Sequence, residues 1–136
     1  MGRWRYLFGL RSMAEIQALT WQLEERALQV ADFAAGEEGK IVGLLRAAIL
    51  KEQNIYSEIG NSEERMIRII QHVKETGRLP SAPTLIAKAD GLQIVDGNHR
   101  IAVYFFLRGR VANGVPNAIP VDANQRFWIG RPTIQQ

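Results

Sequence analysis

The sequence contains no cysteine. A chain without cysteine forms no disulfide, has no thiolate nucleophile and cannot bind zinc through sulfur. Its two histidines, His72 and His99, offer little for a metal site, and we expect none. No apolar run approaches the roughly 20 residues that cross a membrane. The arginines beside Trp4 and Tyr6 interrupt the apolar stretch that a secretory signal needs, so we expect a cytoplasmic protein without a membrane partner.

The composition that is present fits a single globular unit. The chain has 136 residues, of which 46% are hydrophobic, enough for the core of one domain. Its formal net charge of +3 permits contact with nucleotides or nucleic acid without requiring it.

The first 36 residues predict a strand followed by a helix. Large apolar residues occupy every second position from Trp4 to Leu10, which is the period of a half-buried strand. Ser12 and Glu15 then form a capping box, and Gly36 is a suitable helix end. Between them a helical stripe contains Ile16, Leu19, Leu23, Ala27 and Val30.

Two more helices follow. Residues 39–53 have apolar residues at helical spacing, which favours a helix despite Gly43. Ser62 can cap a helix over residues 63–77, whose apolar face contains Met66, Ile69, Ile70 and Val73.

The remainder predicts a hairpin, a buried helix and a last strand. Residues 84–95 contain two short strands joined at Asp90-Gly91, a frequent signal for a tight turn. Residues 99–109 are apolar nearly all round, which indicates a helix buried in the middle of the domain. Residues 117–130 predict a final strand, in which Pro120 indicates a sheet edge or a strand start.

The seam between the hairpin and the buried helix contains Asp96, Gly97, Asn98, His99 and Arg100. A strand that turns directly into a helix aims the first backbone N–H groups of the helix beyond the turn, which favours anion binding. Gly97 allows a ligand to approach the backbone, and His99 and Arg100 add donors. An anionic ligand would offset the unfavourable position of Arg100 near the positive helix end.

A structural interpretation of the same seam is equally open. Asp96 would cap the helix, and His99 and Arg100 would pair with carboxylates such as Glu58 or Glu63. The two interpretations differ for Arg100→Ala, which removes ligand binding in the first and destabilises the fold in the second.

The segment "IVDGNHRIAVYFFLRG", with the hairpin before it and "NAIPV" after it, resembles the ParB/sulfiredoxin-like superfamily. The resemblance covers about Ile55 to Val121. It implies a single α+β domain with a small mixed sheet and packed helices, in which residues 55–136 form the superfamily core and residues 1–54 a strand and helical extension packed on it. It also implies that residues 97–100 contact nucleotide phosphates, such as those of ATP, ADP or CTP with Mg²⁺, and that Asp96 orients them.

The chain departs from two branches of that superfamily. Sulfiredoxins carry a catalytic cysteine where this chain has Asn98, so sulfinic-acid repair is excluded. Partition ParB proteins have an arginine-rich turn and further DNA-binding and dimerisation domains, which this sequence does not show.

A third branch, kinases of free serine with a D-G-H-H-R turn, is more similar at the motif. That similarity implies Glu58 as the catalytic base, with Glu63 and Glu64 as alternatives, because phosphoryl transfer needs positioning, charge neutralisation and one base. A metabolite kinase or nucleotide hydrolase is therefore an alternative to a nucleotide-binding or DNA-associated module, and a non-catalytic structural domain is a third.

Two basic aromatic stretches bear on nucleic-acid binding. Arg3 and Arg5 flank Trp4 near the start, and Arg126, Trp128 and Arg131 lie near the end, where they could meet a phosphate backbone and a base. Taken alone, each stretch is more typical of an edge strand, because aromatic residues in strands are ordinary core residues. The partners that the sequence predicts are nucleotide or DNA, and a homodimer remains open.

Overall fold

The computed structural model describes residues 18–49 and 62–133. The predicted strand over residues 4–10 lies outside them. The elements, in chain order, are β1 (Leu19–Ala27), the short 3-10 helix η1 (Val30–Asp32), α3 (Glu37–Ile49), α4 (Ser62–Thr76), β2 (Thr84–Lys88), β3 (Gly91–Asp96), α5 (Asn98–Ala112) and β4 (Asn124–Pro132).

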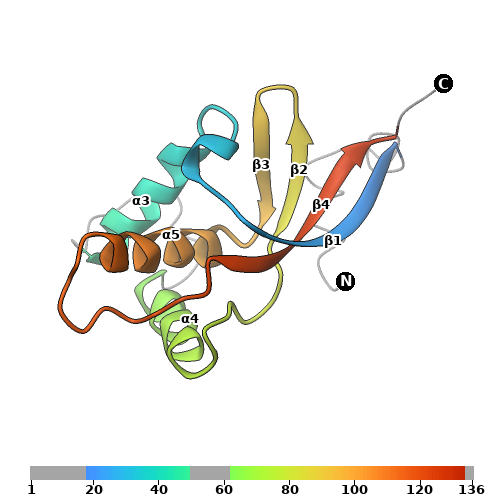
Figure 1. The fold of residues 1–136 in the computed structure, drawn as a ribbon. Helices are drawn as coiled ribbons and strands as arrows, with labels where there is room; N and C mark the ends of the chain where they lie inside the picture. Colours follow the sequence, from blue (N-terminus) through green and yellow to red (C-terminus); the bar gives the residue numbers. More distant parts are fainter. Residues whose placement is uncertain (1–17, 50–61, 134–136) are drawn as a thin grey trace.

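The four strands form one mixed sheet in the order β1-β4-β2-β3. β1 and β4 are antiparallel, β2 and β3 are antiparallel, and β2 runs parallel to β4. Figure 1 shows α3, α4 and α5 gathered to one side of this sheet. The predicted α+β domain with a small mixed sheet and packed helices is confirmed. No helix in residues 18–49 and 62–133 is long and apolar enough to cross a membrane.

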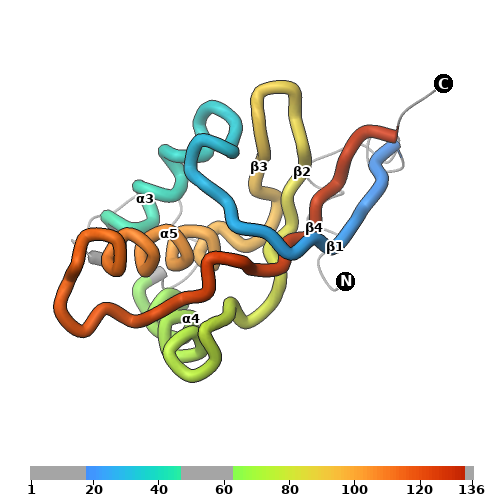
Figure 2. The backbone as a smooth tube through the Cα atoms, in the orientation of Figure 1, coloured from blue at the N-terminus to red at the C-terminus, as the bar shows by residue number. Residues whose placement is uncertain are grey.

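The helix predicted from Ser12 to Gly36 is wrong over residues 19–27, which form β1. β1 pairs with β4 along its whole length, from Leu19 opposite Pro132 to Ala27 opposite Asn124. Figure 2 shows these two segments side by side, although they come from opposite ends of the chain. Tertiary pairing therefore overrides the local helical pattern.

The other predicted helices and the hairpin are confirmed within the described residues, with small shifts at their ends. Residues 50–53 of the helix predicted over residues 39–53 lie outside the described residues. In α4, Met66 and Val73 are buried and Ile69 and Ile70 are partly buried, as the apolar face requires. β2 and β3 pair on either side of the Asp90-Gly91 turn.

Of the two alternatives that Pro120 indicates for the last strand, the sheet edge is wrong, because β4 lies between β1 and β2. β4 begins at Asn124, and Pro120 precedes the strand rather than belonging to it. The proline therefore removes no hydrogen bond from the sheet, and it gives no information on the position of the strand.

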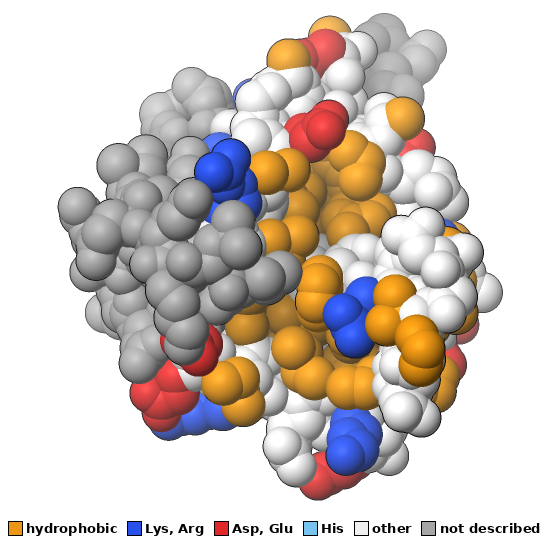
Figure 3. Space-filling model, turned by 90° about the vertical axis from the view of Figure 1, so that its left-hand side faces the viewer, with side chains coloured by type: hydrophobic (Ala, Val, Ile, Leu, Met, Phe, Trp, Pro, Cys, Tyr) orange, Lys and Arg blue, Asp and Glu red, His pale blue; other side chains and the backbone are white. Residues whose placement is uncertain are grey.

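α5 forms the centre of the core, as predicted. Residues 101–104 and Leu107 of α5 are buried, and they share one apolar cluster with residues of the sheet that include Phe127 and Ile129. On the face that lies at the left of Figure 1, hydrophobic side chains remain visible in a hollow (Figure 3). The apolar layer therefore reaches the surface there.

The outer edge of β3 is covered by the segment before α3. The amide of Ala34 donates to the carbonyl of Leu92 at 2.8 Å, and Glu37 accepts the amide of Ile94 at 2.6 Å. Glu37 is only 4% exposed, and its other oxygen lies 2.8 Å from Lys40 Nζ. These contacts satisfy backbone groups that an open edge would offer to another chain.

Gly91 is required where this segment crosses the hairpin. Its φ is +136°, and a Cβ at this position would lie 2.7 Å from the carbonyl carbon of Phe33. We expect Gly91→Ala to lower the free energy of unfolding by at least about 2 kcal/mol, because both the conformation and the contact become unfavourable.

Gly39 provides the matched control. It lies in α3, and a Cβ there meets nothing within 4 Å. Gly39→Ala should therefore raise stability by about 0.5–1 kcal/mol in urea denaturation. Equal effects of the two substitutions would contradict the packing at Gly91.

Candidate functional site

The seam predicted from sequence is a strand, a one-residue turn and a helix. β3 ends at Asp96 and α5 begins at Asn98. Gly97 between them is left-handed, with φ 100° and ψ 31°, and it is the N-cap of α5 without a side-chain capping bond. Asp96 therefore does not occupy the N-cap position that the structural alternative gave it.

Arg100 lies behind this turn. Its Nη2 is 3.0 Å from Oδ2 of Asp96, and its Nη1 donates to the hydroxyl of Ser81. The side chains of Arg100 and Asp96 are only 11% and 15% exposed. A Cβ on Gly97 would lie 2.9 Å from Arg100 Nη2 and 3.0 Å from Pro83 Cβ, so the glycine lets the turn pack on the guanidinium. Arg100 is thus a positioning residue that holds the turn to the start of β2.

This arrangement predicts a large effect of Arg100→Ala on folding. Removal of one partner from a nearly buried pair should lower the free energy of unfolding by about 3–5 kcal/mol. Arg110→Ala, on the same helix, should lower the free energy of unfolding by less than about 1 kcal/mol. The contact that the structure shows for Arg110 is with the ring of Phe106.

The double variant with Asp96→Asn tests the pair directly by denaturant unfolding. The two substitutions should be less than additive, because the second removes a charge that the first left without its partner. Additive losses would show that the two side chains do not stabilise each other.

His99 is half-buried on the first turn of α5. Burial, and then the positive charge of Arg65 on α4, lower the pKa of His99 below its ordinary value of 6.5. The imidazole is therefore neutral at neutral pH, when one nitrogen donates and the other accepts a hydrogen bond. An anion bound between His99 and Arg65 would raise that pKa again.

The depressed pKa predicts a pH dependence of the protein without ligand. Because the unfolded chain binds a proton more readily at His99, stability is complete above pH 6.5 and falls as the pH drops below it. The slope cannot exceed about 1.4 kcal/mol per pH unit for one proton. Urea denaturation from neutral to acidic pH should show this slope in the parent and a smaller slope in His99→Gln. An unchanged slope would assign it to other groups.

Asn98 carries an unusual atom. Its Oδ1 is buried and has no hydrogen-bond partner in the structure. Leaving such an atom without a partner costs about 1–3 kcal/mol, and native proteins rarely accept this without a reason. An amide can present either its oxygen or its nitrogen by a half-turn of the side chain. Asn98 could therefore accept a hydrogen bond from a ligand donor or donate one to an anionic ligand.

Three of the residues predicted to act at sites, Arg3, Arg5 and Glu58, lie outside the described residues. The three predicted near the end of the chain do not form one patch. Arg126 and Trp128 share one face of β4, whereas Arg131 lies on the other, because side chains alternate along a strand. Arg131 makes two hydrogen bonds to Glu24, which raise the pKa of the guanidinium and lower the pKa of the carboxyl group.

Sequence reasoning missed Arg65 and Ser81 at the turn. Ser81, in the segment before β2, accepts a hydrogen bond from Arg100, and Arg65 on α4 acts on His99 through its positive charge. No spacing in the sequence links them to residues 96–100, although "RLPSAP" shows that Ser81 lies in a proline-rich connection.

Within residues 18–49 and 62–133, no group of three or more His, Asp or Glu side chains could hold a metal ion. Comparison of the chain with protein-family models, curated proteins and solved structures finds no match. Arguments on function therefore rest on the residues themselves.

Proposed function

We propose that this protein is a binding module for a phosphate group of a nucleotide or nucleic acid, held at the turn that begins α5. The observation that carries the proposal is the buried, unpartnered Oδ1 of Asn98 in a first helical turn that has no side-chain cap. A phosphate at this position would accept a hydrogen bond from the side-chain NH₂ group of Asn98 after a half-turn of the amide. The positive end of the helix dipole would also stabilise it.

The charges around the turn support an anion. Arg65 and His99 come from different helices, and after burial the positive charge of Arg65 is the second cause that lowers the pKa of His99. Arg100 is neutralised in part by Asp96 and therefore shapes the turn more than it attracts a ligand. Mg²⁺, where a nucleotide brings it, would be bound by the phosphates themselves.

The resemblance of "IVDGNHRIAVYFFLRG" to the ParB/sulfiredoxin-like superfamily supports the same proposal, since members of that superfamily bind nucleotide phosphates at this turn. We place the module in the cytoplasm, where nucleotides and nucleic acid are available. The kinase alternative depends on Glu58, which lies outside the described residues, so no observation favours it over binding alone.

A thermal-shift panel tests the proposal, with ATP, ADP, CTP, pyrophosphate and inorganic phosphate as probes. A ligand at about a hundred times its dissociation constant should stabilise the parent by about 2.7 kcal/mol. Asn98→Leu should weaken that ligand about two- to tenfold, because it removes one hydrogen bond. The same substitution should leave the stability of the free protein unchanged or raise it, since a buried polar atom without a partner is removed.

Asn113→Leu, at the exposed C-terminal end of the same helix, is the matched control and should change neither quantity. Absence of any shift with the parent would refute a phosphate site. A loss of stability in free Asn98→Leu, with ligand affinity intact, would assign Asn98 a purely structural role.

A further inference from the structure

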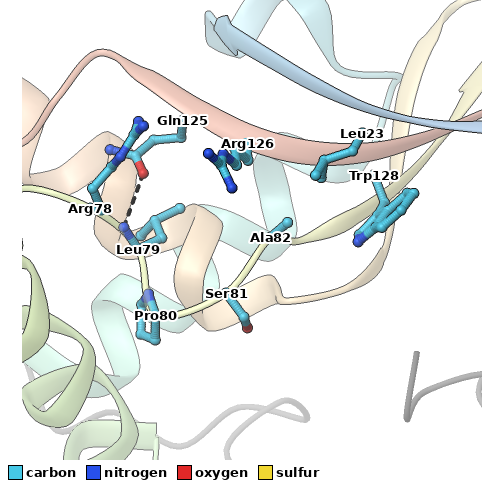
Figure 4. Close-up of a pocket in the computed structure, with 9 residues that line it drawn as sticks. All are labelled: Leu23, Arg78, Leu79, Pro80, Ser81, Ala82, Gln125, Arg126 and Trp128. Carbon is cyan, nitrogen blue, oxygen red and sulfur yellow. Dashed lines mark hydrogen bonds between the residues drawn. The ribbon is translucent and has the colours of Figure 1, made fainter.

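A pocket of about 400 Å³ lies between the segment that precedes β2 and the face of β1 and β4 that is turned away from α5. The segment contributes Arg78 and residues 79–82, and the strands contribute Leu23, Gln125, Arg126 and Trp128. Figure 4 shows the side chains of Arg126 and Trp128 projecting from β4 toward this segment. The volume lies within the range of small-ligand sites.

The strand register divides the pocket into two halves. Leu23 is opposite Trp128, and two residues further Glu25 is opposite Arg126. Residues two apart along a strand share a face, so an apolar pair lies beside a charged pair. The pocket therefore suits a ligand that has a flat apolar part and an anionic part.

The cationic half has more positive charge than its own carboxylate neutralises. One oxygen of Glu25 lies 2.8 Å from Arg78 Nη2 and 3.9 Å from Arg126 Nε. The side chain of Arg126 is 64% exposed, and its contact with Glu25 is longer than a hydrogen bond. Two guanidinium groups thus share one carboxylate, and Arg126 can turn to a second anion at little cost.

The apolar half offers an aromatic surface at the rim. Leu23 is 45% exposed although it is a large hydrophobic residue, and Trp128 beside it is half-buried. Nucleobases stack on exposed aromatic side chains of sheet faces, and an adjacent guanidinium can bind the phosphate that follows the base.

We propose that this pocket binds one nucleotide unit of a single-stranded nucleic acid, with the base against Trp128 and Leu23 and the phosphate at Arg126 and Arg78. The exposed positions of Leu23 and Arg126 leave the pocket open for a strand to enter and leave. This inference does not rest on the proposed phosphate site at α5, because no residue of the turn lines the pocket.

Fluorescence anisotropy with a short labelled single-stranded oligothymidylate tests the pocket, in the full chain and at several salt concentrations. Trp128→Leu should weaken binding at least about fivefold through loss of stacking. Arg126→Gln should reduce the slope of log affinity against log salt by about 0.7, as expected for one lost phosphate contact with a single strand. Glu25→Gln should tighten binding about two- to fivefold, because it removes a competing carboxylate.

The gain expected for Glu25→Gln cannot arise from damage to the fold, so it keeps the test decisive if Trp128→Leu folds poorly. Arg131→Gln removes the same charge from the same strand on the opposite face and should leave affinity unchanged within about twofold. Thymidine monophosphate, tested as competitor, distinguishes a site for a free nucleotide from one that needs a strand.

Three results would overturn the proposal. The first is equal affinity of parent and Trp128→Leu for the oligonucleotide. The second is equally tight binding of an acidic peptide, which would make the pocket a carboxylate site. The third is a loss of affinity with Asn98→Leu and none with Trp128→Leu, which would place the strand at the turn and leave the proposed phosphate site standing.

Discussion

The hydroxyl group of Tyr104 connects α5 to the two strands that bring the ends of the described chain together. It accepts the amide of Leu28 at 3.0 Å, just after β1, and donates to the carbonyl of Ala123 at 2.5 Å, just before β4. Arg108, one turn further along α5, donates to the same hydroxyl at 2.9 Å and also to the carbonyl of Leu28. A fully buried tyrosine needs such partners, and here they fix where the β1-β4 pair meets the helix.

The position of that pair decides the character of both sheet faces. Toward α5, Phe127 and Ile129 of β4 complete the core. Away from α5, Trp21 of β1 packs over Gly130, where any Cβ would lie 2.9 Å from the indole ring. The same alternation separates Arg126, which is on the pocket side, from Arg131, which is held by Glu24. A single register therefore explains which cation is available and which is already bound.

The elements predicted correctly are those whose signals are local. Asp90-Gly91 specifies its own turn, and the apolar face of α4 needs no distant partner to be recognised. β1 was mispredicted because Leu19 and Leu23 are four residues apart, a spacing that lies on one face of both a helix and a strand. Glu24, which suits a helix by propensity, is instead satisfied by Arg131 from the far end of the chain. Such long-range pairing gives no signal within a short segment of the sequence.

The candidate site shows the same division. The turn at Gly97 and the helix that follows it could be predicted, since the glycine and the change of hydrophobic period are sequence features. The buried oxygen of Asn98 without a hydrogen-bond partner and the effect of Arg65 on the pKa of His99 could not be predicted, because both depend on how helices pack.

The segment before β2 links the two candidate sites, and Gln125 determines its path. Gln125 is buried, accepts the amide of Leu79 at 3.0 Å and donates to the carbonyls of Gly77 and Asp122 at 3.1 and 2.8 Å. Four residues beyond Gly77, Ser81 lines the pocket and accepts a hydrogen bond from Arg100 behind the turn. One buried amide thus sets the geometry of a segment that forms a wall of the pocket and a support of the turn, so the shapes of the two sites are coupled through the backbone that they share.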